Sequence, residues 1–200
     1  MTPTDVQPFI FKCAPTPDLA ALCLVGDRVI LRSVEERDAA VMFAEFNAAV
    51  TRYMYPKPAE HLDETLEFIA RSRAAMESQT ELVLAITLSD DGFLGCCGVH
   101  LTQGPRSPEL GIWIKQSAQG QGYGREAICT VARWLVQTLA FDYVIYPVDR
   151  ANIASRKIPE ALGGVVFREQ VITALTGHVL DEVVYKISTA TLSTRLAAAS

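Results

Sequence analysis

The segment Glu109–Glu126 constrains the fold most, because a strand pattern, a glycine-rich loop and a helix pattern follow one another within it. Apolar and less apolar residues alternate over Leu110–Ile114, which predicts a strand. The loop that follows contains Gly120, Gly122 and Gly124. Backbone N–H groups converge at such a loop without obstruction by Cβ atoms, and the next helix adds unpaired donors and the positive end of its dipole. The segment therefore predicts an anion site suited to a pyrophosphate.

The spacing of the glycines excludes two common phosphate-binding loops. A Walker loop requires Gly-Lys-Ser/Thr, which does not follow here, and a dinucleotide fingerprint requires a glycine where this chain has Arg125. The spacing present is Gln119-x-x-Gly122-x-Gly124. Taken alone, such a loop also fits a tight connection with no ligand.

Placed between a strand and a long helix, this spacing resembles the coenzyme A signature of the GNAT N-acetyltransferase superfamily, and specifically its RimJ/RimL-like branch. The likeness extends over about residues 24–187. It includes the block Gly26–Arg32 near the beginning and the later block Asn152-x-x-Ser155, which is followed by Glu160-Ala161-Leu162-Gly163. Blocks in this order, separated by the expected elements, make the resemblance specific.

The resemblance implies that acetyl-CoA is the cosubstrate. The implied cofactor-binding residues are Ile112, Trp113, Ile114, Gln119, Gly120, Gln121, Gly122, Tyr123, Gly124, Arg125, Asn152 and Ser155. Backbone groups of the strand would pair with the pantetheine arm as an added strand does, and the loop amides with Arg125 would hold the pyrophosphate. Asn152 and Ser155 would hydrogen-bond the arm from the other side, with Arg156 or Lys157 near the adenosine phosphates.

The implied fold is α/β (α+β), with a mixed, mostly antiparallel central sheet of about six to seven strands and helices on both faces. Periodicity and turn residues predict strands at Val29–Ser33, Leu82–Leu88, Phe93–Leu101, Glu109–Lys115, Tyr143–Val148, Val165–Ile172 and Val179–Ile187. Helices are predicted at Glu35–Ala49, Asp63–Met76, Tyr123–Leu139 and Asn152–Leu162. The resemblance implies a splay between the two central parallel strands, which would receive the thioester.

We expect three regions along the chain. Residues 1–24 contain four prolines and predict an irregular arm whose apolar pieces pack on the domain. Residues 25–188 form the acetyltransferase domain, and residues 189–200 form a tail that is either a short helix or frayed.

Candidate catalytic residues are Glu109 and Ser155. Glu109 would accept the ammonium proton directly or through water, and its other interpretation is a solvated carboxylate at a strand end. Ser155 would lie near the departing thiolate, and its other interpretation is a binding hydroxyl. Many superfamily members have a tyrosine four residues later as the general acid, but this chain has Pro159. Tyr143 and Tyr146 are predicted to pack in the core or on the sheet.

Composition narrows the classes of partner and cofactor. The chain has 23 acidic and 18 basic residues and a formal charge of −5, which disfavours nucleic acid as the main partner. Its five cysteines and three histidines show no metal-ligand spacing, so we expect no metal. Adjacent Cys96 and Cys97 are predicted to be small buried residues. No apolar run is long enough to span a bilayer and no leader pattern opens the chain, so we expect no membrane partner and a cytoplasmic location.

The sequence thus predicts an acyltransferase that acetylates a primary amine, either a protein N-terminus or a small amine. A homodimer is compatible with this prediction. A CoA-binding sensor without turnover is the alternative, and a nucleotide-binding fold without acyl chemistry is a third class. Arg52–Pro56 would either border the acceptor channel or cap the core.

Overall fold

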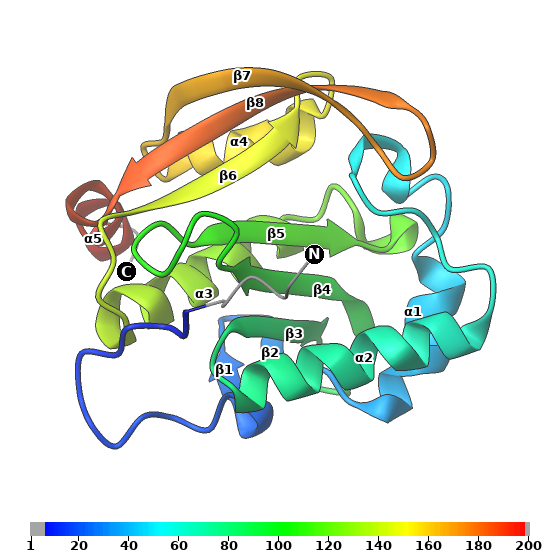
Figure 1. Ribbon diagram of the computed structural model, residues 1–200, viewed down its shortest axis with the longest axis horizontal. Helices are drawn as coiled ribbons and strands as arrows, with labels where there is room; N and C mark the ends of the chain where they lie inside the picture. The colour runs from blue at the N-terminus through cyan, green and yellow to red at the C-terminus, as the bar shows by residue number, and fades with distance from the viewer. Residues whose placement is uncertain (1–6, 199–200) are drawn as a thin grey trace.

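The computed structural model describes residues 7–198, so residues 1–6 of the expected arm and 199–200 of the expected tail lie outside the described part. Within it, one sheet has the strand order β1-β2-β3-β4-β5-β6-β8-β7. The strands are β1 Cys23–Val25, β2 Ile30–Ser33, β3 Glu81–Thr87, β4 Phe93–His100, β5 Glu109–Ile114, β6 Tyr143–Asp149, β7 Val165–Thr173 and β8 Val179–Ser188. Figure 1 shows the sheet running through the whole domain.

The sheet divides between β5 and β6. Every other neighbouring pair is antiparallel, whereas these two strands are parallel and pair only at Glu109 and Ile145. Beyond that point β6 leaves β5 and continues with β8 and β7 as a separate wing (Figure 1). The predicted mixed α/β fold and its splay are confirmed.

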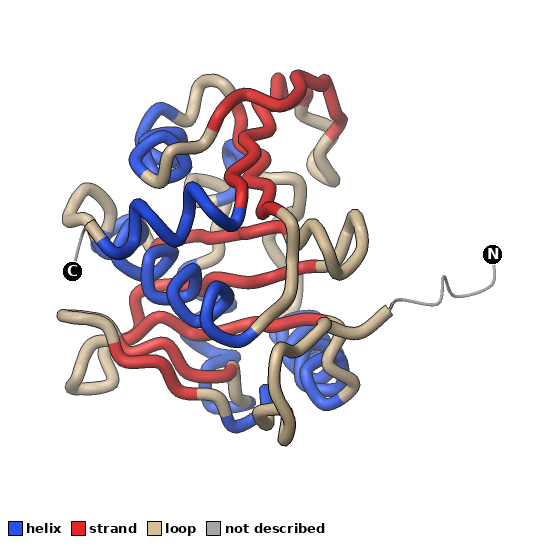
Figure 2. Tube along the Cα trace, turned by 90° about the vertical axis from the view of Figure 1, so that its left-hand side faces the viewer, coloured by secondary structure: helices blue, strands red, loops and turns tan. Residues whose placement is uncertain are grey.

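Helices cover both faces of the sheet (Figure 2). Their bounds are α1 Ala39–Glu45, α2 Leu62–Glu77, α3 Tyr123–Thr138, α4 Ile153–Ala161 and α5 Thr189–Ala197. The pair α1 and α2 packs on one face, against β3 and β4, and α3 packs on the other face, with α4 and α5 beside it. The buried stripe of α3 includes Ala127, Ile128, Val131 and Leu135, which repeat at helical spacing.

The observed elements differ from the prediction at two places, and at a third the structure has one of the two predicted alternatives. The eighth strand, β1, was not predicted, because three residues are too few to show a period of two. The helix predicted at Glu35–Ala49 is shorter: α1 ends at Glu45, and the side chain of Asn47 accepts hydrogen bonds from the N–H groups of Ala49 and Val50, which starts a new turn. The tail forms helix α5, whose Leu192 and Leu196 are buried.

The arm packs on the domain from residue 7 onward. Phe9 and Leu19 are buried, and the backbone N–H of Phe9 donates to the carbonyl of Gln79 at 2.8 Å. Phe11 forms an isolated β-bridge with Leu139, just after α3. The arm therefore covers the ends of α2 and α3.

Candidate active site

The glycine loop connects β5 to α3 on the protein surface. Gly120 and Gly122 have φ of 75° and 84°, the left-handed region that glycine enters without strain. Gly122 is the N-cap of α3, and no side chain caps the helix. A Cβ at Gly120 would meet nothing within 4 Å. The loop is thus exposed and lies at a helix N-terminus that no side chain caps, which suits an anion.

Two further contacts hold the loop against β5. The side-chain amide of Gln119 donates to the carbonyl of Ile114 at 2.9 Å, which ties the loop to the end of the strand. A Cβ at Gly124 would lie 3.4 Å from the side chain of Ile114, so glycine lets α3 start close to β5.

Arg28 fastens the opposite side of the loop, a role that sequence reasoning did not assign. Its guanidinium donates to the carbonyl of Gln121 at 3.1 Å and to the carboxylate of Glu126 at 2.8 Å, and it lies 4.8 Å above the ring of Tyr123. Burial raises the pKa of Glu126, but hydrogen bonds from Arg28 and Val29 outweigh burial, so this pKa is lowered. Arg28 therefore adds a positive charge beside the loop.

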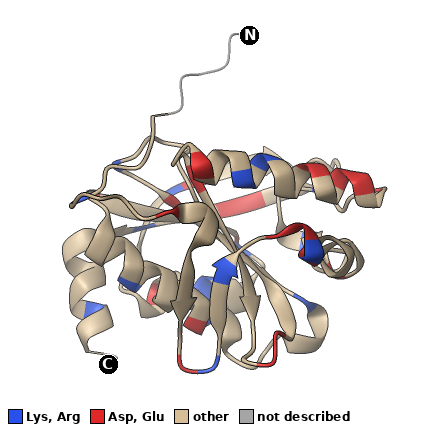
Figure 3. Ribbon diagram, turned by 90° about the horizontal axis from the view of Figure 1, so that it is seen from below, with Lys and Arg blue, Asp and Glu red and all other residues tan. Residues whose placement is uncertain are grey.

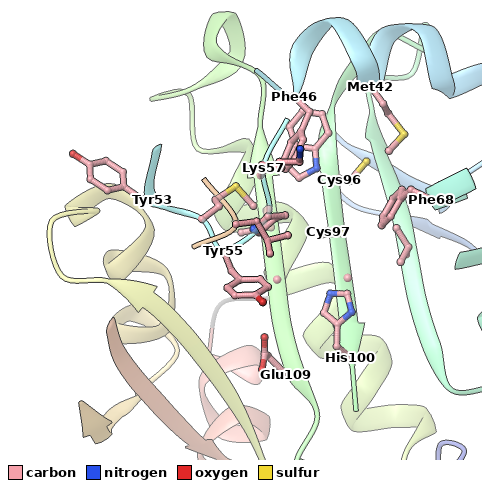
Figure 4. A pocket seen from close by; sticks show the side chains of 18 of the residues that line it. Met42, Phe46, Tyr53, Tyr55, Lys57, Phe68, Cys96, Cys97, His100 and Glu109 are labelled. Carbon is pink, nitrogen blue, oxygen red and sulfur yellow. The ribbon is translucent and has the colours of Figure 1, made fainter. Parts of the chain in front are cut away.

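A cavity of about 610 Å³ opens at the splay (Figure 4). It contacts five of the predicted site residues, namely Glu109, Ile112, Trp113, Asn152 and Ser155. Ile114, the last residue of β5, and the loop residues Gln119–Arg125 do not line the cavity. They follow the lining residues of β5 along the chain. The splay and the loop therefore form two neighbouring parts of one site along β5.

The aromatic segment before α2 lines the cavity. Tyr53, Met54, Tyr55 and Pro56 all contact the cavity, together with Phe43, Phe46 and Phe68 from the first two helices. Trp113 stacks at its inner end, 5.0 Å from the ring of Phe46. We call these apolar side chains the aromatic wall.

Charged side chains surround the rest of the cavity. Glu109 accepts a hydrogen bond from the hydroxyl of Thr102 at 2.7 Å. Glu182 is 8% exposed, and burial, together with nearby Glu109 and Asp149, raises its pKa despite a hydrogen bond from Gln170. Acidic residues also occupy the first half of α2 (Figure 3), where Glu64 and Glu67 contact the cavity. The carboxylates favour a cationic ligand.

Ser155 has two hydrogen-bond partners that explain its position. Its backbone N–H donates to the side chain of Asn152 at 3.2 Å, so the Asn-x-x-Ser block forms the N-cap of α4. Its hydroxyl lies 2.9 Å from the hydroxyl of Tyr146 on β6. Tyr146 is buried, and burial raises its pKa to about 12. A tyrosine therefore reaches Ser155 from the sheet, although Pro159 occupies the expected position on α4.

Arg156 does not face the glycine loop. Its guanidinium donates to the hydroxyl of Tyr185 at 3.1 Å and to the carbonyl of Arg150 at 3.3 Å, which fastens α4 to β8 and to the end of β6. Arg156 is one of the two side chains expected near the adenosine phosphates, and in the structure it makes these contacts.

The cysteines of β4 are buried in the cavity wall. Burial raises the pKa of Cys97 to about 12 and that of Cys96 well above the usual value, so neither is an activated nucleophile. Among residues 7–198, no three His, Cys, Asp or Glu side chains are arranged to hold a metal ion. Within the same residues, no helix combines the length and apolar character needed to cross a membrane.

Comparisons with known proteins agree with this geometry. The family model described as the acetyltransferase (GNAT) domain matches residues 28–165. The uncharacterized N-acetyltransferase YoaA of Bacillus subtilis is 28% identical over 143 residues, which are 70% of this chain and 81% of that protein.

Solved structures share the fold at low sequence identity. The spermidine N-acetyltransferase of Vibrio cholerae, in complex with CoA and spermine, has a TM-score of 0.72 and 20% identity, covering 83% of this chain and 98% of that chain. A GCN5-related N-acetyltransferase of Brucella melitensis has a TM-score of 0.73 and 15% identity, covering 94% of this chain and 87% of that chain.

Proposed function

Because the chain belongs to the GNAT acetyltransferase family, we propose that it is an N-acetyltransferase that moves the acetyl group of acetyl-CoA to a primary amine by direct attack on the thioester. The observation that carries the proposal is the uncapped glycine loop at the end of β5, beside the cavity that Glu109 and Ser155 both line. The loop would receive the phosphates and the splay would receive the acyl end.

The donor side fits the shape and charge of coenzyme A. Gly120 and Gly122 place no side chain in the loop at their own positions, and Arg28 and the exposed Arg125 add positive charge. Ile112–Ile114 lie beside the splay, where the next strand no longer pairs with them, so their backbone groups suit an added extended ligand. Bound acetyl-CoA would supply an activated acyl group. The same binding mode of CoA would also use the other predicted cofactor-binding residues, namely Gln119, Gln121, Tyr123, Gly124 and Asn152.

On the leaving-group side, we assign Ser155 and Tyr146 to the departing sulfur. A tyrosine with a raised pKa stays protonated near neutral pH, so it can donate to the oxygen of Ser155. The Ser155 O–H is then available to donate to the sulfur as negative charge develops.

On the acceptor side, we propose a small cationic amine with an apolar body. A cavity of about 610 Å³ suits a small ligand. The aromatic wall offers apolar surface, and Glu109 and Glu182 offer negative charge at its base. The side chains in the cavity that are able to take the proton of the amine include Glu109 and His100.

The alternative is a CoA-binding sensor without turnover, which Pro159 favours because it removes the usual acid. The hydrogen bond between Ser155 and Tyr146 weighs against this alternative. A cytoplasmic location, membership of the RimJ/RimL-like branch, a homodimer and the three-region division of the chain stay predictions from the sequence.

Release of free thiol from acetyl-CoA, measured over a panel of amines, tests the proposal. We expect turnover with arylalkylamines, weaker turnover with spermidine, and the least with peptides that present a free N-terminus. Calorimetry with CoA and ADP separates the third class, because a plain nucleotide-binding site would bind both equally well, whereas we expect clearly weaker binding of ADP. CoA binding without turnover on any amine would support the sensor.

A further inference from the structure

We infer that His100, oriented by Glu81, is the base that takes the proton from the attacking amine. This inference rests on the proposed function and adds a residue pair to it. Glu81 is the first residue of β3 and His100 is the last residue of β4, and His100 contacts the cavity (Figure 4).

The two side chains form a fixed pair. Glu81, His100 and Glu109 are direct neighbours across β3, β4 and β5, so their side chains point to the same face of the sheet. Nδ1 of His100 lies 2.7 Å from Oε1 of Glu81. Because a carboxylate has only acceptors, Nδ1 carries the hydrogen, and the lone pair of the neutral ring is on Nε2.

Nε2 lies over a hollow made by two paired glycines. A Cβ at Gly98 would lie 2.7 Å from Nε2, and a Cβ at Gly111 would lie 3.3 Å from it. These glycines are direct neighbours across β4 and β5, and both contact the cavity. Their missing side chains leave room for the imidazole to reach back along the sheet toward Ile112 and Trp113, where we place the acyl end.

The side chain of Glu109 makes a different contact from that of His100. Its carboxylate accepts a hydrogen bond from Thr102, which lies two residues beyond His100, the last residue of β4. A carboxylate is also a much weaker base than an imidazole, since reference pKa values are about 4.3 and about 6.5. We therefore assign Glu109, with Glu182, to attracting the cationic acceptor and His100 to proton transfer.

The bound ammonium first gives one proton to solvent, and the resulting neutral amine attacks the carbonyl carbon, so the C–N bond forms and nitrogen becomes positively charged. Nε2 of His100 takes one proton from this nitrogen, the C–S bond breaks, and sulfur leaves with the electron pair. The imidazolium gives its proton to solvent and the thiolate takes one up, so the products are the amide and the free thiol.

The test measures kcat/KM against pH for the wild type and four variants, His100→Gln, Glu81→Gln, Gly111→Ala and the control His178→Gln. His178 is an exposed histidine in the turn between β7 and β8. For the wild type we expect activity to fall with decreasing pH along a one-proton limb, because protonation of Nε2 removes the base. His100→Gln should lose this limb and about 10²- to 10⁴-fold of kcat/KM, whereas the control should match the wild type.

The other two variants test the positioning. Glu81→Gln keeps an acceptor for Nδ1 but removes the negative charge that stabilises the imidazolium, so the limb should move to lower pH. A purely structural role of Glu81 would leave the limb in place. Gly111→Ala should lower kcat because its Cβ would lie 3.3 Å from Nε2, which is close enough to require a small shift of the ring. Calorimetry should give unchanged CoA affinity for His100→Gln, which shows that the donor site is intact.

Two results would overturn the inference alone: wild-type turnover that His100→Gln leaves within about threefold, or a limb of the pH profile that Glu109→Gln removes and His100→Gln does not. Absence of wild-type turnover on every amine would overturn the proposed function and the base assignment together.

Discussion

Removing the carboxylate of Glu126 should destabilise the protein through the turn that fastens the glycine loop. This carboxylate accepts hydrogen bonds from the backbone N–H of Arg28 at 2.5 Å, from the guanidinium of Arg28 at 2.8 Å and from the backbone N–H of Val29 at 3.1 Å. Glu126→Ala leaves both backbone donors without this acceptor, whereas Glu126→Gln keeps one side-chain oxygen in place.

The size of the effect follows from the exposure of each partner. The Val29 donor is partly buried, and losing its acceptor costs roughly 1–2 kcal/mol. The Arg28 donors reach water, since the side chain of Arg28 is 52% exposed, so they add only a few tenths of a kcal/mol each. We therefore expect Glu126→Ala to lower the free energy of unfolding by about 2 kcal/mol, and Glu126→Gln by about half as much.

Thermal and urea unfolding at several pH values measures this effect. At neutral pH, about 2 kcal/mol corresponds to a fall in Tm of roughly 4–8 °C for a domain of this size. The pKa of Glu126 is lowered in the folded state, so its stabilising effect is complete above the unfolded pKa and is lost as pH falls through the folded pKa. The gap between wild type and Glu126→Gln should therefore close below about pH 4. A constant gap down to pH 3, or equal stability at neutral pH, would refute this reasoning.

Two further substitutions test other contacts. Tyr146→Phe removes the hydroxyl that lies 2.9 Å from Ser155. We expect kcat to fall about tenfold, the effect of losing one hydrogen bond, with an unchanged KM for acetyl-CoA. An unaltered kcat in steady-state assays would contradict the role assigned to Tyr146. Gly163→Ala places a Cβ 2.7 Å from Thr191 at a φ of +80°, so urea unfolding should show a loss of about 1–3 kcal/mol. The control Gly104→Ala has the same type of backbone strain, but its Cβ would meet nothing within 4 Å. Equal losses of unfolding free energy for both variants would mean that the contact with α5 contributes nothing.

Local patterns were sufficient to predict most of the fold and the glycine loop. The alternation in Leu110–Ile114, the glycines at 120, 122 and 124, and the buried stripe of α3 are each properties of neighbouring residues. A strand–loop–helix unit therefore emerges from a short stretch of sequence. The Asn152-x-x-Ser155 block is local in the same sense, because Asn152 caps the helix that contains Ser155.

The contacts that sequence reasoning missed depend on the register of the sheet. His100 and Glu81 are 19 residues apart and meet only because β3 and β4 pair with that offset. Arg28 and Glu126 are separated by 98 residues, and no spacing rule connects them. Tyr146 was expected to pack, and it does so, but only the approach of α4 to β6 brings its hydroxyl to Ser155.

Calorimetric titration of CoA into the wild type and Gly122→Glu tests the central claim most directly, namely that the backbone of the loop before α3 holds the diphosphate. The substitution puts a side chain and a negative charge into the proposed cradle. Gly177→Glu is the matched control, because Gly177 has a φ of 82°, close to the 84° of Gly122, and lies in the turn between β7 and β8. We predict that Gly122→Glu abolishes binding and that the control keeps wild-type affinity. Undiminished binding by a folded Gly122→Glu variant would contradict the claim.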